Sequence, residues 1–191
     1  MDIIIKNNNV DLIFVTSPPH GIQLLALKLK KELLVENYNV IMTREKDESL
    51  EELSNIKTSR YRKDLDARKT IINENQPLAY VSIHVNASTK TSARGVKIYH
   101  FPGSVEGQRL AENIKESIDE HLYKKYLKED NLKSEVLTEN YYILRETKYP
   151  GVLIEIGFIT NPEENKLMKS KKYKEKIAYA IKKGIVEFLG K

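Results

Sequence analysis

The sequence predicts one α/β domain, built on a largely parallel or mixed twisted sheet of about six strands with helices on both faces. Two near-continuous apolar runs, residues 78–83 and 151–154, are typical of central strands that are buried on both sides. Around them, short β-rich segments alternate with segments of helical periodicity. Because 191 residues with 40% hydrophobic content can bury a core, we expect a single domain over residues 1–191.

The first part of the chain predicts a strand, a helix and a second strand. Residues 11–15 are apolar and β-rich and end at Thr16-Ser17-Pro18-Pro19, which indicates a buried strand running into a turn. A helix follows, because apolar residues then recur at helical spacing. They are Ile22, Leu25, Ala26, Leu29 and Leu33. Residues 39–43 predict the next strand, and residues 44–57 predict a charged, exposed loop with some helix.

The remaining elements continue the alternation of strands and helices. A helical pattern covers residues 65–75, and residues 95–99 alternate like a half-buried strand. Another helix starts after Ser104, its expected N-cap, and carries an apolar stripe. The stripe consists of Leu110, Ile114, Ile118 and Leu122. A last helix, with apolar residues at helical spacing from Tyr173 to Leu189, closes the domain.

Composition limits the chemistry that this chain can perform. The chain contains no Cys, which excludes a disulfide framework, a Cys nucleophile and a thiolate metal site, so any metal must be held by His, Asp or Glu. The net charge of +5 favours polyanionic partners such as nucleic acid, anionic cell-wall polymers or acidic lipid headgroups. The Lys-rich run over residues 166–183 is spread around an amphipathic helix pair, which indicates a solvated face rather than a nucleic-acid-binding stripe.

The amino terminus has none of the features of a targeting segment. Residues 1–9 contain an acidic residue near the start and only three consecutive apolar residues, so we expect neither a signal peptide nor a membrane span there. No other stretch is apolar over the length that is needed to cross a bilayer. We therefore expect no export signal and no transmembrane segment within this chain.

Two polar residues stand out against the predicted central strands. His84 follows an apolar strand, which places it at the carboxyl end of that strand, where ligands bind in open α/β sheets. The alternative is a histidine that hydrogen-bonds a loop at the strand end. Glu155 interrupts an apolar segment, where an unpaired carboxylate is costly to desolvate. A metal ion or a metal-bound water would compensate its charge; the alternative is a structural salt bridge, for example to Arg145.

A third residue, His20, lies at the turn between the first strand and the first helix. By the same topological rule, it should lie at the same edge of the sheet as His84 and Glu155. Two histidines and a glutamate that converge from strand ends would form a hydrolytic zinc site with an open position for water. Zinc would lower the pKa of that water, and Glu155 would take its proton during attack on an amide carbonyl. We expect His100 and His121 to be surface or core-edge residues.

Several motifs, in order and spacing, resemble those of the zinc-dependent N-acetylmuramoyl-L-alanine amidases. The resemblance runs from about Ile13 to the carboxyl terminus and implies the phosphorylase/hydrolase-like α/β fold of that family. It also implies hydrolysis of the amide between N-acetylmuramic acid and L-alanine in peptidoglycan. The motifs are Thr43-Arg44 with Asp47, Leu65-Asp66-Ala67-Arg68 with Asn73, residues 81–87, Arg94-Gly95-Val96, Tyr142-Ile143-Leu144-Arg145 and residues 150–164.

The resemblance also implies roles for individual residues. His84 is similar to a zinc ligand of the family, Glu155 to its catalytic carboxylate and His20 to its first zinc-binding histidine, while Asn86 and Arg145 are implied as substrate-binding residues. The family usually has Asp-Pro-Gly-His-Gly-Gly, and then a Glu ligand that opens the first helix. This chain has Ser-Pro-Pro-His-Gly and enters the helix directly, so the loop after His20 is shortened and one protein ligand is missing from the sequence.

Two features point to a subgroup of the family. Tyr99-His100-Phe101-Pro102 and the long charged insert over residues 47–62 are most similar to the germination-specific amidases of the spore cortex. The resemblance therefore implies action outside the cytoplasm, in the cell wall or spore envelope, with peptidoglycan as substrate and no nucleic-acid partner. The alternative, because one zinc ligand is missing, is a catalytically impaired protein with the amidase fold that binds peptidoglycan or a protein partner without cleavage. The oligomeric state stays open.

Overall fold

The computed structural model describes residues 10–16, 20–45 and 48–190, with the backbone alone described at residues 15–16 and 20–23. Within this part of the chain, six strands form one sheet in the order β2-β1-β3-β6-β4-β5. Neighbouring strands pair in parallel, except for β4 and β6, which are antiparallel. The strands are β1 (Leu12–Thr16), β2 (Val40–Met42), β3 (Ala79–Asn86), β4 (Lys97–His100), β5 (Glu135–Thr138) and β6 (Gly151–Phe158). The predicted mixed sheet is thus confirmed.

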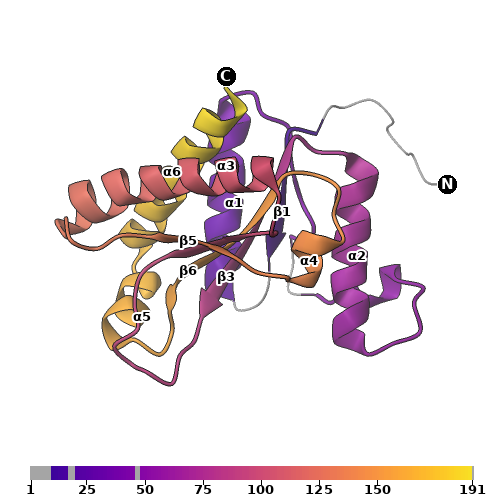
Figure 1. Cartoon of the computed structure of the whole chain (residues 1–191), viewed down its shortest axis with the longest axis horizontal. Helices are drawn as coiled ribbons and strands as arrows, with labels where there is room; N and C mark the ends of the chain where they lie inside the picture. The colour runs from indigo at the N-terminus through magenta and orange to yellow at the C-terminus, as the bar shows by residue number, and fades with distance from the viewer. Residues whose placement is uncertain (1–9, 17–19, 46–47, 191) are drawn as a thin grey trace.

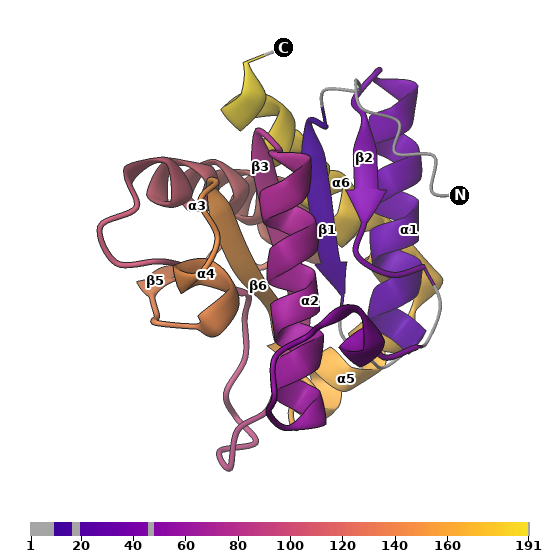
Figure 2. The ribbon, with the colours of Figure 1, turned by 90° about the vertical axis from the view of Figure 1, so that its right-hand side faces the viewer.

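Helices cover both faces of this sheet, as predicted. On one side lie α1, α3 and α6, and on the other lie α2 and the short α4; Figure 2 shows α2 in front of the sheet (Figures 1 and 2). The helices are α1 (His20–Val35), α2 (Arg60–Asn75), α3 (Val105–Ile118), α4 (Tyr142–Arg145), α5 (Pro162–Lys169) and α6 (Lys171–Leu189), with the 3-10 turn η1 (Glu51–Leu53) and the π-helix η2 (Asp119–Leu127). In the described residues, no helix is long and apolar enough to cross a membrane.

The side-chain alternation of the strands divides the core into two clusters. One cluster joins the sheet to α1, α3 and α6 and includes Val81, Ile83 and Ile154, all fully buried. The other joins it to α2 and α4 and includes Tyr80 and Leu153. Because successive side chains of a strand point to opposite faces, His84 lies on the face of Tyr80, and Glu155 lies on the face of Leu153. Both candidate residues therefore face the layer formed by α2 and α4.

β5 and the helix that begins after Ser104 are among the elements that differ from the sequence prediction. β5 was not predicted, because none of its four residues is buried and its sequence has no apolar alternation. The helix that begins after Ser104 is capped by the Ser104 side chain, as predicted, but at Asp119 it changes from α to π geometry. Leu122 continues the apolar stripe across that change and is fully buried, so the sequence pattern did not reveal it.

Candidate active site

His84 and Glu155 lie next to each other on neighbouring parallel strands. The register of β3 and β6 pairs His84 with Glu155 directly, so the two side chains project from the same face of the sheet. Residues paired in this way lie roughly 5 Å apart at Cα. β1 reaches the same region, since Thr16 at its end pairs with Ile83 of β3. The topology therefore brings the ends of β1, β3 and β6 to one edge of the sheet, where ligands bind in α/β folds.

The Glu155 carboxyl group is half-buried and has an oxygen without a partner. Its Oε2 atom is buried and accepts no hydrogen bond from the part of the chain that the structure describes. Burial raises the pKa of Glu155 to about 7, because the charged form is poorly solvated there. A carboxylate with a pKa near neutrality can take and return a proton at physiological pH. This group has the properties of a general base.

Glu155 and Arg145 do not form the structural salt bridge that was the alternative explanation for Glu155. Arg145, at the end of α4, donates instead to Glu146 Oε1 at 2.8 Å and to Asn140 Oδ1 at 2.9 Å. Glu155 also acts on Tyr99 of the neighbouring strand β4. Burial, followed by nearby charges that include Glu155, raises the pKa of Tyr99 to about 12. Lys97 is the residue of β4 that pairs with Glu155, but its ammonium group is bonded to Glu135 Oε1 at 2.7 Å.

His84 is held on one side by a buried serine. Its Nε2 atom lies 2.9 Å from the Oγ atom of Ser82, which is fully buried on the same face of β3. Burial, followed by the positive charge of Arg68, lowers the pKa of His84 to about 4. The ring is therefore neutral at physiological pH, which is the form of histidine that binds metals. A ligand at Nδ1 requires the tautomer in which Nε2 carries the proton and donates it to Ser82 Oγ.

Arg68 on α2 supplies the positive charge beside His84. It is only 2% exposed, donates from Nε to Asp64 Oδ2 at 2.6 Å and from Nη1 to Thr43 Oγ1 at 3.4 Å. These contacts tie the motif around Thr43 to the motif around Arg68. The family motifs that the sequence showed in this region therefore have a structural role, which is to fix α2 against the face of the sheet that carries His84.

Asp66 connects the same helix to two other segments. Its carboxylate accepts from Ser54 Oγ at 2.7 Å, from Lys69 Nζ at 2.7 Å and from Tyr142 OH at 3.2 Å. Ser54 belongs to the charged segment before α2, and Tyr142 begins α4. Asp66 thus holds the charged insert and α4 onto α2.

The other predicted site residues lie in different surroundings. His20 begins α1, but its side chain is outside the described residues, as are Ser17, Pro18, Pro19 and Asp47, so its role as a metal ligand stays a prediction. Asn86 ends β3, and its Oδ1 atom accepts from the backbone N–H of Ala87 at 2.8 Å. His100 is 5% exposed, with its ring 3.0 Å from the Phe101 carbonyl, which agrees with the expected core-edge position.

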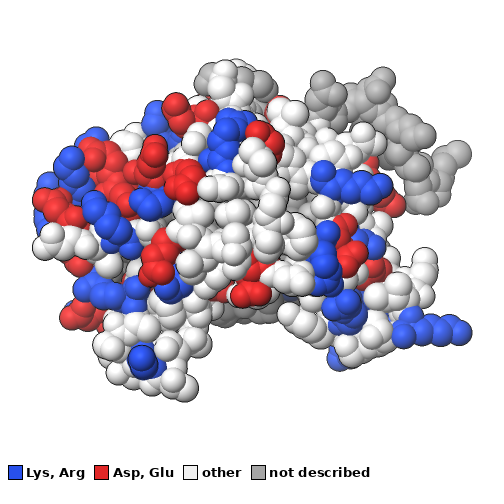
Figure 3. Space-filling model, viewed as in Figure 1, with Lys and Arg blue, Asp and Glu red and all other residues white. Residues whose placement is uncertain are grey.

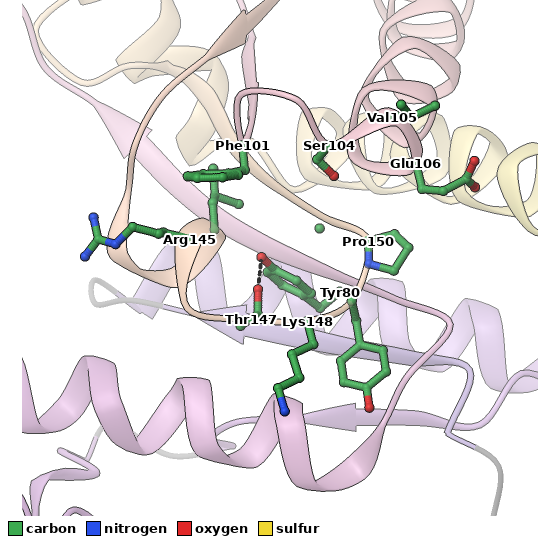
Figure 4. A pocket seen from close by; sticks show the side chains of 12 residues that line it. Tyr80, Phe101, Ser104, Val105, Glu106, Arg145, Thr147, Lys148 and Pro150 are labelled. Carbon is green, nitrogen blue, oxygen red and sulfur yellow. Dashed lines mark hydrogen bonds between the residues drawn. The ribbon is translucent and has the colours of Figure 1, made fainter.

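Arg145 lines a hollow of about 490 Å³ at the other end of β6. Figure 4 shows this hollow, with the guanidinium group of Arg145 extending away from the other labelled side chains (Figure 4). The Thr147 hydroxyl donates a hydrogen bond to the Tyr80 hydroxyl there. The hollow reaches β6 at Gly151, and at the usual rise of a strand this lies about 13 Å from Glu155. The hollow is therefore separate from the pair of His84 and Glu155, and substrate binding by Asn86 and Arg145 stays a prediction.

One donor that a zinc ion would need and one group that could accept a proton from its bound water are present in suitable states. They are the neutral ring of His84, which would suit a metal ion, and the unpartnered Oε2 atom of Glu155, which would suit a metal-bound water. The described part of the chain contains no group of three His, Asp or Glu that could hold a metal. A further donor has to come from elsewhere, and the predicted His20 is the candidate that the topology brings to this edge.

A buried glutamate that the sequence reasoning missed shapes the strand beyond Glu155. The register shifts between His84 and Asn86, which leaves one extra residue on β6, and Gly157 there has a φ of 141°. Glu164, which is 3% exposed, accepts from the backbone N–H groups of Phe158 at 2.7 Å and Gly95 at 2.8 Å. Its place as the third residue of α5, after the N-cap Asn161, is visible in the sequence but gives no sign of these two hydrogen bonds.

Comparison with known proteins gives the same family from sequence and from structure. Residues 22–187 match the family model described as N-acetylmuramoyl-L-alanine amidase, a match that begins after His20. Over 165 residues the chain is 30% identical to the germination-specific N-acetylmuramoyl-L-alanine amidase of Bacillus subtilis (strain 168), covering 86% of this chain and 67% of that protein. It is 32% identical over 107 residues to the probable cell wall amidase LytH of Staphylococcus aureus, covering 56% of this chain and 34% of LytH.

The solved structures agree with the sequence matches. The CwlD amidase from Clostridioides difficile, in complex with the GerS lipoprotein, superimposes with a TM-score of 0.83 at 28% identity, covering 94% of this chain and 98% of that chain. The amidase AmiC2 of Nostoc punctiforme superimposes with a TM-score of 0.76 at 21% identity, covering 97% of this chain and 100% of the other, and this likeness shows the fold. Both the family and the fold are therefore those that the motifs indicated.

Proposed function

The chain belongs to the N-acetylmuramoyl-L-alanine amidase family, and we propose that it hydrolyses the amide between N-acetylmuramic acid and L-alanine in peptidoglycan with Glu155 as general base. The observation that supports these roles most directly is the buried, unpartnered carboxylate oxygen of Glu155 beside the neutral ring of His84. Similarity to the germination-specific amidases favours spore-cortex peptidoglycan as the substrate.

The proposed reaction uses Glu155 twice. Its Oε2 atom takes a proton from the attacking water as the water oxygen bonds to the amide carbonyl carbon. The protonated carboxyl group then returns that proton to the amide nitrogen as the C–N bond breaks. His84 and His20 would hold the zinc ion, which when bound lowers the pKa of the water and polarises the carbonyl group. Asn86 and Arg145 are proposed to bind the substrate, as the family resemblance implies.

The relatives also suggest where the chain acts and with what. Their names refer to the cell wall and to germination, and one solved relative forms a complex with a lipoprotein. We infer that this chain acts outside the cytoplasm on the wall or spore cortex and that a protein partner of the lipoprotein type assists it.

The proposal is tested by measuring zinc content and muropeptide release on the same preparations. Because one protein ligand is missing, the wild-type chain is expected to bind zinc only when metal is supplied, and then to release peptides that begin with L-alanine. Glu155→Gln should keep the zinc and lower the turnover about 100-fold or more. A chain that binds no zinc at micromolar metal and whose activity is unaffected by Glu155→Gln would disprove the proposed mechanism. Peptidoglycan binding without cleavage would then support the non-cleaving alternative.

A further inference from the structure

A second hollow, of about 490 Å³, lies between the π-helix η2 and the helix α6. Its volume is within the range of small-molecule sites in proteins. All of its lining residues are basic or aromatic: His121, Lys125, Tyr126, Lys172, Lys176 and Tyr179. Both elements belong to the layer that covers the sheet on the face opposite to His84 and Glu155. The hollow is thus independent of the candidate active site.

The unusual geometry of η2 places three of these side chains together. π-helices are rare, usually consist of a single turn and are often found at functional sites, whereas η2 has nine residues. Its hydrogen bonds connect residues five apart, which is the spacing between His121 and Tyr126, so these two side chains lie above one another on one side. On the other side of the hollow, Lys172, Lys176 and Tyr179 recur at α-helical spacing on one face of α6.

Buried residues of both helices fix the walls of the hollow. Tyr123 of η2 and Tyr173 of α6 are 1% and 2% exposed, and both belong to the main core cluster. The lining rings are also packed against neighbours, since the ring of His121 meets that of Tyr179 edge-on, with centroids 5.4 Å apart. Lys172 Nζ lies 5.8 Å from the centroid of the Tyr126 ring. The site is therefore built on regular elements rather than on a loop.

The positive charge of the hollow is largely uncompensated. Lys125 is paired with Glu120 Oε1 at 3.1 Å, but no carboxylate of the described residues lies within ion-pair distance of Lys172 or Lys176. The acidic residue of α6 nearest to them in sequence, Glu175, pairs with Lys28 of α1 at 2.8 Å. Over the end of the molecule where α3 lies, Figure 3 shows Lys and Arg interspersed with Asp and Glu, so charges of both signs are mixed on that part of the surface (Figure 3). None of the described acidic residues lines the hollow, and Lys172 and Lys176 are the two lysines there that a bound anion could pair with.

We propose that this hollow binds a phosphodiester group of an anionic wall polymer built from polyol or sugar phosphates. Lys172 and Lys176 contact the phosphate oxygens, because ammonium groups form strong charge-assisted hydrogen bonds to phosphate. Tyr126 and Tyr179 offer ring faces and edges to the adjoining polyol or sugar carbons. The choice of a wall polymer rests on the proposed function, and binding there would hold the chain at the wall while leaving the face of His84 and Glu155 open.

The test uses the full chain and three probes: a purified polyol-phosphate polymer, inorganic phosphate and single-stranded DNA of equal phosphate number. The double variant Lys172→Gln/Lys176→Gln removes two charges from the hollow. The control Lys166→Gln/Lys169→Gln removes two exposed charges from neighbouring α5. At physiological salt, the first variant is expected to weaken polymer binding about tenfold or more and the control about threefold or less. Tyr179→Leu should weaken binding of the polymer and leave that of inorganic phosphate unchanged.

Three results would overturn the proposal. Equal losses in the two lysine variants would mean that only overall charge matters. DNA binding as tight as polymer binding, with the same dependence on Lys172 and Lys176, would mean a site for any phosphodiester. Binding of inorganic phosphate without any preference for the polymer would mean a site for the free ion.

The same measurements separate this proposal from the proposed function. Polymer binding does not need the amidase reaction and should persist in Glu155→Gln. Muropeptide release without polymer binding would disprove the polymer site alone, whereas polymer binding without release would disprove the amidase mechanism alone.

Discussion

The Oγ atom of Ser82 lies 2.9 Å from Nε2 of His84, and the two side chains share the face of β3 that α2 covers. Ser82 is fully buried, so its hydroxyl group cannot exchange His84 for a water molecule as its hydrogen-bond partner. The hydroxyl group therefore sets the orientation of the imidazole and determines which ring nitrogen is available to a metal. Groups in this position typically contribute tenfold to a hundredfold to metal affinity.

Ser82→Ala is expected to lower the zinc affinity of the chain by about tenfold to a hundredfold, because the ring of His84 loses its fixed orientation. Competition with a metal chelator measures this directly. The loss of one hydrogen bond should reduce the free energy of unfolding by only about 1 kcal/mol. Ser82→Thr, which keeps the hydroxyl group and suits a strand, should retain most of the affinity. Unchanged zinc affinity in Ser82→Ala would show that the serine does not position the ring.

Gly157→Ala is expected to be more destabilising than the same change at another glycine with positive φ. Gly157 has a φ of 141°, and a Cβ atom there would lie 3.1 Å from the Oε2 atom of Glu164. Gly103 has a φ of 81°, but a Cβ atom there would meet nothing within 4 Å. Gly103→Ala should therefore cost about 1 kcal/mol for backbone conformation, and Gly157→Ala about 1–3 kcal/mol. Urea unfolding of both variants measures the difference, and equal losses would contradict a role for the contact with Glu164.

The position of the site could be predicted from sequence, because it depends on the strongest patterns. The apolar runs before His84 and around Glu155 identify central parallel strands, and the carboxyl ends of such strands meet at one edge. The direct register of the two residues and the hydrogen bond between Ser82 and His84 could not be predicted, since a shift by one position would leave the hydrophobic content of each strand unchanged.

Other features left no usable pattern in the sequence. The π geometry of η2 was missed because Leu122 fits the α-helical stripe as well. Glu164 was missed because a glutamate near a helix start normally faces solvent, and its burial depends on the N–H of Gly95, far away in the sequence. Tertiary hydrogen bonding of this kind is decided by the fold rather than by local sequence.

Asp66 is expected to contribute to the acid sensitivity of the fold. Its hydrogen bond from Lys69, followed by that from Ser54, holds the pKa of Asp66 below its ordinary value. Because the pKa of Asp66 is lower in the folded than in the unfolded state, ionised Asp66 adds to the free energy of unfolding. This addition is fully present above the unfolded-state pKa of about 3.9 and is lost as the pH falls through the folded-state pKa. Melting temperatures measured from pH 6 to pH 3 should therefore fall less steeply for Asp66→Asn than for the wild type. Glu52→Gln, at an exposed residue of the same charged segment, is the matched control and should leave the slope nearly unchanged.

Glu164→Ala is expected to loosen the end of β6 next to the candidate active site. The substitution leaves the N–H groups of Phe158 and Gly95 buried without acceptors, and each such group costs about 1–3 kcal/mol. Glu163→Ala is the control, because the Glu163 carboxylate is exposed. Its contact with a charged group is weak, with Oε2 3.8 Å from Arg94 Nη1. Hydrogen exchange should then accelerate at the Phe158 and Gly95 amides in the first variant and not in the second. If both amides stay protected in Glu164→Ala, the backbone beyond Glu155 is held by the strand pairing alone, and Glu164 does not support the site.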